Sequence, residues 1–204
     1  MKHLIIVIIG AVVALLGAGC ASTTPTREIS FGYAIFDILA GPEIGPARIA
    51  EAVKVALQAN MSQVQIVNGI PPSPLPQVPP RFQLLSPFKG SNLAALAAAS
   101  GQSLQVPTCE GAILSANARD TSMARYGEGT TFFACVMPYQ GGYRLNIYTT
   151  FAKASGAFSA ATLEATLART VVGDSSQFIP RTIAQVVDGV KGTGASVTLV
   201  EAFP

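Results

Sequence analysis

The first twenty residues constrain this chain more than any other part of it. After Lys2, an apolar run covers residues 4–16, and small residues follow at 17–19. As a helix, that run rises about 20 Å, which is short of the roughly 30 Å hydrocarbon core of a membrane. A positive start, a short apolar run and small residues before a cleavage point are typical of a secretory signal. The sequence therefore predicts export.

Cys20 follows the run directly, after the small residues Ala18 and Gly19. This arrangement resembles the lipobox of bacterial lipoproteins, although Gly17 stands where that motif prefers leucine. The resemblance implies that Cys20 becomes the new N-terminus as a palmitoylated diacylglycerol-cysteine. Ala21 replaces the aspartate that signals inner-membrane retention, which implies a lipid anchor in the outer membrane with the protein facing the periplasm.

The expected organisation is a lipoprotein signal peptide over residues 1–19, a lipidated tether over 20–26 and one periplasmic domain over 27–204. Two alternatives remain open at this stage. One is an uncleaved N-terminal membrane helix, and the other is a simple cleaved signal that leaves Cys20 as a free thiol. No second apolar run in the chain is long enough to span a membrane.

Composition excludes several classes of function. The chain has 13 Lys and Arg against 11 Asp and Glu, without a basic stripe, so nucleic acid is not an expected partner. Its one histidine, His3, lies in the leader, which leaves no Ser-His-Asp triad and no histidine metal site. The carboxylates are scattered. We therefore expect a protein that is not an enzyme and that uses neither a cofactor nor a metal.

Strand and helix patterns alternate through the rest of the chain. Apolar residues at every second position of 28–39 (Ile29, Phe31, Tyr33 and Ile35) predict a strand with one strongly apolar face. Six prolines fall within residues 71–80, which predicts an extended segment. Further helices are expected from Pro46, over 92–100, from Ser159 and after Pro180. Further strands are expected over 64–67, 82–85, 103–118, 130–139, 143–153 and 197–203.

These elements predict an α+β single domain, with a mainly antiparallel sheet and helices packed on one of its faces. The clearest local signal is a hairpin that turns at residues 140–142 (QGG). The first strand, helix and second strand read as a β-α-β unit.

Cys109 and Cys135 are the thiols that remain besides Cys20. Because an exported protein enters an oxidising space, an even pair is expected to form a disulfide. We expect the two residues to face each other across a hairpin centred near residue 122. Two buried free thiols are the alternative.

Two segments are candidates for binding a partner. The loop 119–129 carries Arg119, Asp120, Arg125, Tyr126 and Glu128, and arginine and tyrosine are enriched at interface hot spots. The alternative for this loop is a solvated hairpin tip. The proline-rich segment offers a preformed extended ligand, or else it is a stiff crossover within the domain.

The expected function is a non-catalytic accessory or scaffold in cell-envelope assembly or transport, held beside an envelope protein partner by its lipid. The alternative is a periplasmic module that binds a lipid, a glycan or peptidoglycan. The apolar composition and a set of aromatic residues support that alternative, although such residues more often form core: Phe31, Tyr33, Phe36, Phe132, Phe133 and Tyr148.

Substitution Cys20→Ala tests the anchor. Cells fed a fatty-acid analogue are expected to label the natural chain and not the variant, because the acyl chains attach through the Cys20 thiol. Labelling that persists in the variant would contradict lipidation at this residue, and an unlabelled natural chain would favour one of the two alternatives.

Overall fold

The computed structural model describes residues 26–86, 105–122, 124, 127–155 and 178–204. In this part of the chain, a six-stranded and a two-stranded sheet accompany two helices, α2 (Pro46–Asn60) and α5 (Phe178–Lys191). The strands are β1 (Thr26–Leu39), β2 (Gln63–Asn68), β3 (Gln83–Leu85), β4 (Val106–Thr108), β5 (Leu114–Asp120), β6 (Glu128–Tyr139), β7 (Gly142–Ser155) and β8 (Ser196–Phe203). The α+β class is confirmed.

The large sheet is antiparallel throughout, in the order β2-β5-β6-β7-β1-β8. The expected hairpin is present as β6 and β7, which turn at Gln140 and Gly141. In the expected β-α-β unit, strands β1 and β2 are parallel, but β7, β6 and β5 lie between them in the sheet. The two strands of the unit are therefore not neighbours, and the unit spans most of the sheet.

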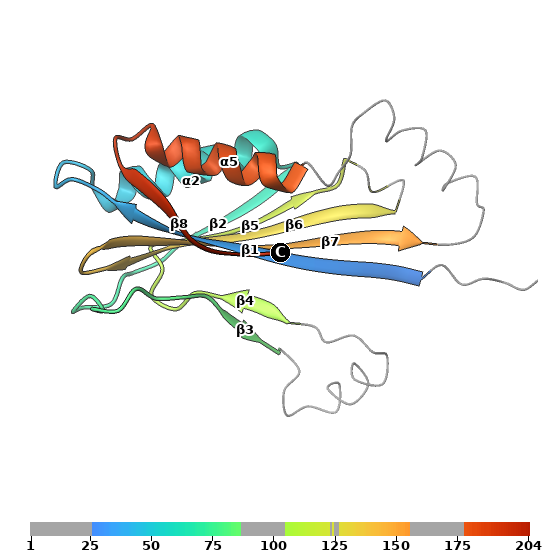
Figure 1. The fold of residues 1–204 in the computed structure, drawn as a ribbon, viewed down its shortest axis with the longest axis horizontal. Coiled ribbons are helices and arrows are strands. Elements are labelled where there is room, and N and C mark those ends of the chain that lie inside the picture. Colours follow the sequence, from blue (N-terminus) through green and yellow to red (C-terminus); the bar gives the residue numbers. More distant parts are fainter. Residues whose placement is uncertain (1–25, 87–104, 123, 125–126, 156–177) are drawn as a thin grey trace, which may run out of the picture.

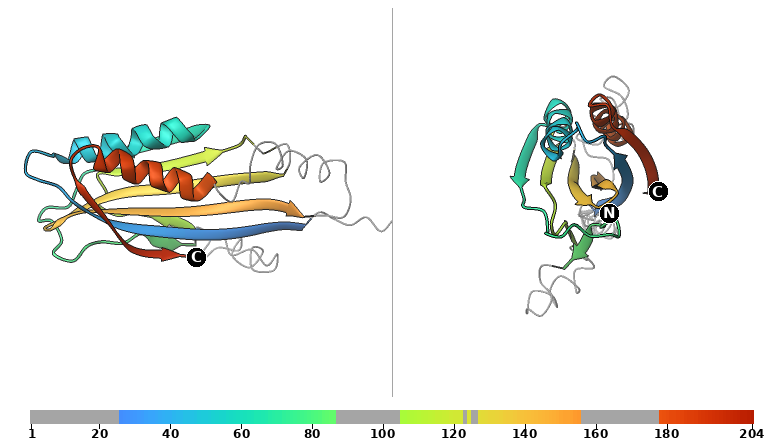
Figure 2. Two further views of the ribbon diagram at one scale, coloured as in Figure 1. Left: turned by 45° about the horizontal axis from the view of Figure 1, so that its top comes forward. Right: turned by 90° about the vertical axis from the view of Figure 1, so that its left-hand side faces the viewer.

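The two helices lie side by side on one face of the sheet, as expected, and β3 and β4 lie on the other side (Figures 1 and 2). Pro46 occupies the first turn of α2, where the missing N–H costs nothing. Ile49, Val53 and Leu57 form the buried stripe of that helix. They pack on the sheet residues that face them, among them Leu114, Phe132, Val136, Leu145 and Ile147.

The opposite face of the sheet is covered by the chain between β2 and β3. The proline-rich segment crosses it without regular secondary structure, and its carbonyls at Leu75 and Pro76 accept hydrogen bonds from the Gln140 side chain and backbone. Beneath this cover, Phe133, Cys135, Met137 and Tyr148 form a second apolar cluster. The segment is therefore hydrogen-bonded to the domain's own β6–β7 turn, although most of its residues are exposed.

The strand expected over 28–39 is present as β1, but its helix-covered face is not the one that the alternation marks. The helices pack at Ala34, Phe36 and Ile38, whereas Ile29, Phe31, Tyr33 and Ile35 lie on the other face. Ile35 is buried on the opposite side, while Ile29 and Phe31 are 55% and 52% exposed. Because both faces of β1 are covered along only part of its length, simple alternation does not identify the core face.

Two expected helices, over 92–100 and from Ser159, lie outside the described residues. In the described part, no helix combines the length and the apolar character needed to cross a membrane.

Leu57→Ala tests the core assigned to α2, with Val55→Ala as the matched control on the same helix. Leu57 is fully buried, whereas Val55 is 53% exposed. The core variant is expected to lose about 2–5 kcal/mol of unfolding free energy in urea, because it loses buried apolar surface and leaves a cavity. The control is expected to stay within about 0.5 kcal/mol. Equal losses in the two variants would contradict the assigned packing.

Candidate functional site

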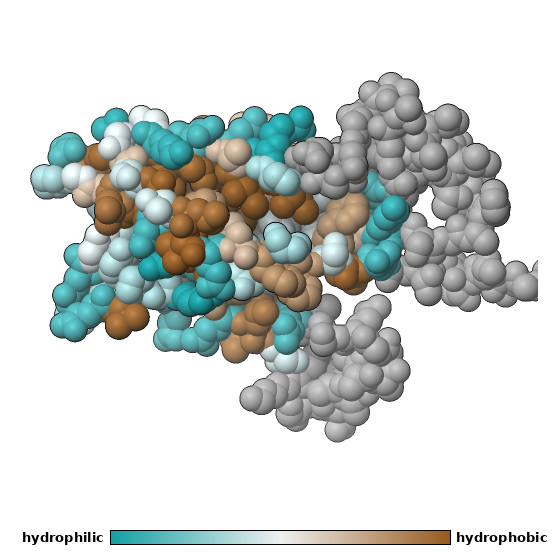
Figure 3. Space-filling view, viewed as in Figure 1, coloured by the Kyte–Doolittle hydropathy of each residue, from teal (hydrophilic) through white to brown (hydrophobic). Residues whose placement is uncertain are grey.

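An apolar groove of about 1180 Å³ lies between α5 and the β8 side of the sheet. Its floor is formed by β1 and β7, with Ser30, Gly32 and Ala34 contributed by β1. Ile183, Ala184 and Val187 of α5 form one wall, and residues of β8 form the other. On the face shown in Figure 3, hydrophobic side chains gather between α5 and the sheet, along the line of this groove.

The groove is open for two reasons that can be read from the chain. First, the floor residues of β1 are small, so they do not fill the space below α5. Second, β8 pairs with β1 only from Leu39 to Tyr33, whereas β7 pairs with β1 as far as Thr26. Beyond Phe203, no described strand continues the sheet on that side. The result is a hollow with one open flank.

Charged side chains lie at the limits of the groove and alternate in sign. Asp188 and Lys191 lie on α5, and Glu128 and Lys153 lie on the sheet. Lys153 is opposite both Glu28 on β1 and Glu128 on β6. An apolar interior with a few charged groups at its limits is the usual composition of a binding pocket.

A polar network holds the end of β8 beside the groove. The Tyr33 hydroxyl donates a hydrogen bond of 2.6 Å to Glu201 Oε1, and Arg81 Nη1 lies 2.9 Å from Glu201 Oε2. These bonds lower the pKa of Glu201, with the Tyr33 hydrogen bond as the largest cause, and the same bond raises the pKa of Tyr33. The network joins the end of the proline-rich cover to β8 and β1.

Aromatic rings extend from this network over the lip of the groove. Phe31 and Tyr33 stack on Phe203, at ring-centre distances of 5.6 Å and 5.9 Å. The ring centres of Tyr33 and Tyr148 each lie 5.7 Å from the ring centre of Phe82. Among the aromatic residues singled out from the sequence, Phe36 and Phe132 belong to the core under the helices, and Phe133 and Tyr148 belong to the second cluster. Phe31 is exposed and Tyr33 is half-buried against the second cluster, and both border the groove.

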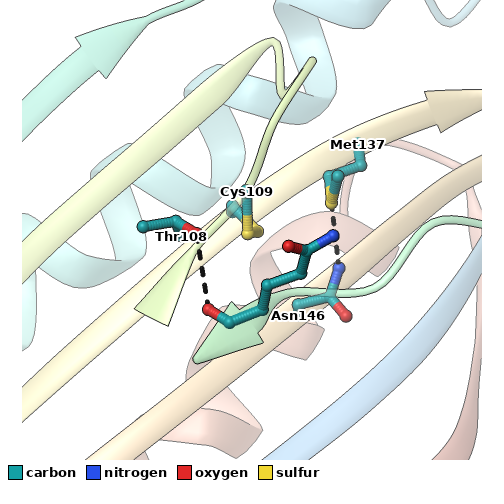
Figure 4. The surroundings of a disulfide bond; sticks show 6 residues. Thr108, Cys109, Met137 and Asn146 are labelled. Carbon is teal, nitrogen blue, oxygen red and sulfur yellow. Dashed lines mark hydrogen bonds between the residues drawn. A yellow bond between two sulfur atoms is a disulfide. The ribbon is translucent and has the colours of Figure 1, made fainter. Parts of the chain in front are cut away.

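Cys109 and Cys135 form a disulfide. The expected hairpin geometry is wrong, because Cys135 lies opposite Ser115 and the β5–β6 pairing is centred near residue 125. Cys109 comes instead from the segment that follows Thr108 of β4, and it reaches Cys135 from the outer side of the sheet (Figure 4). The disulfide therefore links the segment after β4 to β6 in the middle of the sheet, next to the hydrogen bond from the Asn146 side chain to Met137 Sδ.

A second cluster of polar and charged side chains lies on the outer face of the sheet and consists of Asp37, Tyr139 and Arg144. Arg144 Nε is 3.1 Å from Asp37 Oδ1, as an ion pair without hydrogen-bond geometry, and the Tyr139 hydroxyl donates to the same oxygen at 3.1 Å. Burial is the largest cause that raises the pKa of Tyr139. This cluster lies on the outer face of the sheet, whereas the groove lies under α5.

The other sequence candidates lie in different places. Cys20, Arg125 and Tyr126 are outside the described residues. Asp120, at the end of β5, accepts hydrogen bonds from Ser62 and Ser122, and Arg119 precedes it on the same strand. Glu128 is only 3% exposed and lines the groove, so it does not lie on the surface of a hairpin tip.

The α5 wall of the groove was not expected from the sequence, although a signal for it was present. The apolar stripe of the helix expected after Pro180 consists of Ile183, Val186, Val187 and Val190. Val186 and Val190 fill the core, whereas Ile183 and Val187 lie beside it and face the groove. An apolar stripe wider than the core needs indicates a surface that binds something else.

Within the described ranges, no group of three His, Cys, Asp or Glu side chains is placed to hold a metal ion. Fold and groove together describe a single-domain α+β protein with an open apolar groove.

Comparison with known proteins assigns no family, since no protein-family model and no curated protein matches the chain. One solved structure, the crystal structure of Ara h 8.0201, is similar at 12% identity over 80% of this chain and 99% of that chain. The TM-score is 0.17, which carries no statement about fold or function.

Tyr33→Phe tests the network at the end of β8. Loss of the hydroxyl is expected to raise the pKa of Glu201 back toward its ordinary value of 4.5, as followed by carboxyl-carbon NMR titration. Because the folded pKa is lowered, the interaction stabilises the fold above about pH 4.5 and is lost as the pH falls through the lowered value.

Tyr143→Phe is the control, because only burial raises the pKa of that tyrosine. It is expected to leave the Glu201 titration unchanged. The network would be contradicted by a Glu201 titration that is the same in Tyr33→Phe as in the natural chain.

Proposed function

We propose that this chain is an outer-membrane-anchored lipoprotein that acts as a non-catalytic accessory or scaffold in cell-envelope assembly or transport. In this proposal the acylated Cys20 holds the domain at the membrane through the tether 20–26, and an envelope protein binds the groove beside α5. Two or more acyl chains anchor a protein stably, so the lipid alone supplies the membrane attachment.

The groove is the observation that carries the proposal. A single domain of this size has little reason to leave Ile183, Val187 and Leu199 around an open hollow unless something covers them, since large exposed apolar patches mark binding sites. The residue sets of familiar catalysis, which depend on histidine, are missing from the sequence after the leader. Binding is therefore the function that these residues support.

A second candidate is a periplasmic module that binds a small apolar ligand such as a lipid. The apolar lining of the groove favours this candidate, and its volume of about 1180 Å³, slightly above the usual range for small-molecule sites, leaves room for such a ligand. Native mass spectrometry of the purified protein distinguishes the two, since a retained small molecule of constant mass supports the ligand candidate.

Ala184→Arg tests the groove, with Gln185→Arg as the control. Ala184 is exposed and lines the groove, whereas the neighbouring Gln185 lies outside it, in a hollow shared with α2. After mild crosslinking in cells and purification in detergent, the natural chain and the control are expected to carry the same defined envelope protein. The long charged side chain introduced by Ala184→Arg fills the groove, so a loss of at least about tenfold in that product is expected for this variant.

Isolated monomer in every preparation would contradict the scaffold proposal. A crosslinked product that is equally abundant in the two variants would place the partner elsewhere on the domain.

A further inference from the structure

One half of β1 has an unpaired edge. Among the described residues, β7 pairs with β1 along its whole length on one side, but β8 reaches only Tyr33 on the other. Between Thr26 and Phe31, every second residue of β1 therefore directs its backbone N–H and C=O toward the open flank of the groove. At about 3.3 Å per residue, this free edge is about 20 Å long.

The other two edges of the sheet differ from this one. β2, the edge strand on the far side of the sheet, does not border the groove. β8 has an irregularity opposite Ile35 and Phe36, which leaves Val200 without a partner on β1. A bulge of this kind discourages pairing with another chain. The free edge of β1 is regular, and it carries the exposed apolar residues Ile29 and Phe31.

We propose that the free edge of β1, Thr26–Phe31, binds an extended strand of a partner protein by antiparallel β-strand addition, in line with β8. This inference deepens the proposed function, since it rests on the groove as the partner-binding surface and specifies the partner segment. Backbone hydrogen bonds to the edge supply affinity, and the side chains that alternate along the added strand supply specificity.

The register of β7 indicates which side chains the added strand carries. Residues directly opposite in an antiparallel pair point to the same face, so the side chain opposite Ser30 enters the groove. On β7 that place is taken by Phe151, and the place opposite Glu28 is taken by Lys153. An added strand with an apolar residue opposite Ser30 and a basic residue opposite Glu28 matches both the apolar hollow and the exposed carboxylate.

A second copy of the chain fits this edge less well. In a symmetric antiparallel pair of β1 edges centred on Ile29, Glu28 of one copy would lie opposite Ser30 of the other and point into the apolar groove. The strand pair would then contribute no cation opposite Glu28, which keeps only Lys153 on its β7 side. Centring the pair on Glu28 places two carboxylates face to face, which is destabilising. Charge complementarity therefore favours a different polypeptide as the occupant.

The probe is a capped synthetic peptide, TFAKAS, with the sequence of residues 150–155, which pair with Thr26–Phe31 on the β7 side. It is added to the processed protein in detergent while the backbone amide NMR signals are followed. We expect saturable shifts at Thr26–Phe31 and none at β2. N-methylation of alternate peptide nitrogens is expected to abolish binding for one set of positions and spare it for the other, because only one set faces β1.

Charge exchange tests the register. Glu28→Lys is expected to weaken binding of TFAKAS about two- to fivefold and to strengthen binding of the peptide TFAEAS by a similar factor, as for opposite charges across a strand pair. Glu43→Lys, an exposed change outside the groove, is the control and is expected to alter neither affinity.

Three results would overturn the strand proposal. The first is binding that tolerates both N-methylated sets equally, which indicates side-chain contacts alone. The second is a concentration-dependent dimer that perturbs β1 without peptide. The third is the absence of peptide binding while the crosslinked product is still lost in Ala184→Arg. In that case the proposed function stands and the strand proposal fails. Failure of both tests together would remove the groove as a binding surface.

Discussion

The pairing of β1 with β7 is the interaction on which the rest of the structure depends. It runs from Thr26 opposite Ser155 to Ile38 opposite Tyr143, and it places the small residues of β1 beneath α5. Because β8 covers only the later half of the same strand, the sheet has a complete core at one end and an open edge at the other. The groove is the direct result of this difference in length.

Both faces of the sheet are covered along the later half of β1, whereas the earlier half borders the groove. α2 and α5 cover one face, and the β3–β4 sheet lies over the other, where Cys109, just after β4, is bonded to Cys135. The Tyr33, Glu201 and Arg81 contacts join this cover to the end of β8. The partly exposed residues of the groove thus lie beside a well-packed core, as is usual for binding sites on small domains.

Local patterns predict most of this fold, while its long-range pairings escape them. The helix from Pro46 and the hairpin turning at residues 140–142 follow from periodicity and turn residues within a short window. Strand order, the separate β3–β4 sheet and the approach of Cys109 to Cys135 depend on pairings between distant segments, which one sequence does not specify. The groove was missed because an apolar residue such as Val187 looks the same in a pattern whether it is buried or left beside an open edge.

If a partner strand binds the free edge of β1, this edge is covered in the working protein. Hydrogen–deuterium exchange of the amides between Thr26 and Phe31 measures this directly, in isolated envelopes and in the protein purified in detergent. The account predicts that alternate amides of this edge exchange at least about tenfold more slowly in the envelope, while those of β2 exchange equally in both. Equal exchange at the β1 edge in the two samples would contradict it.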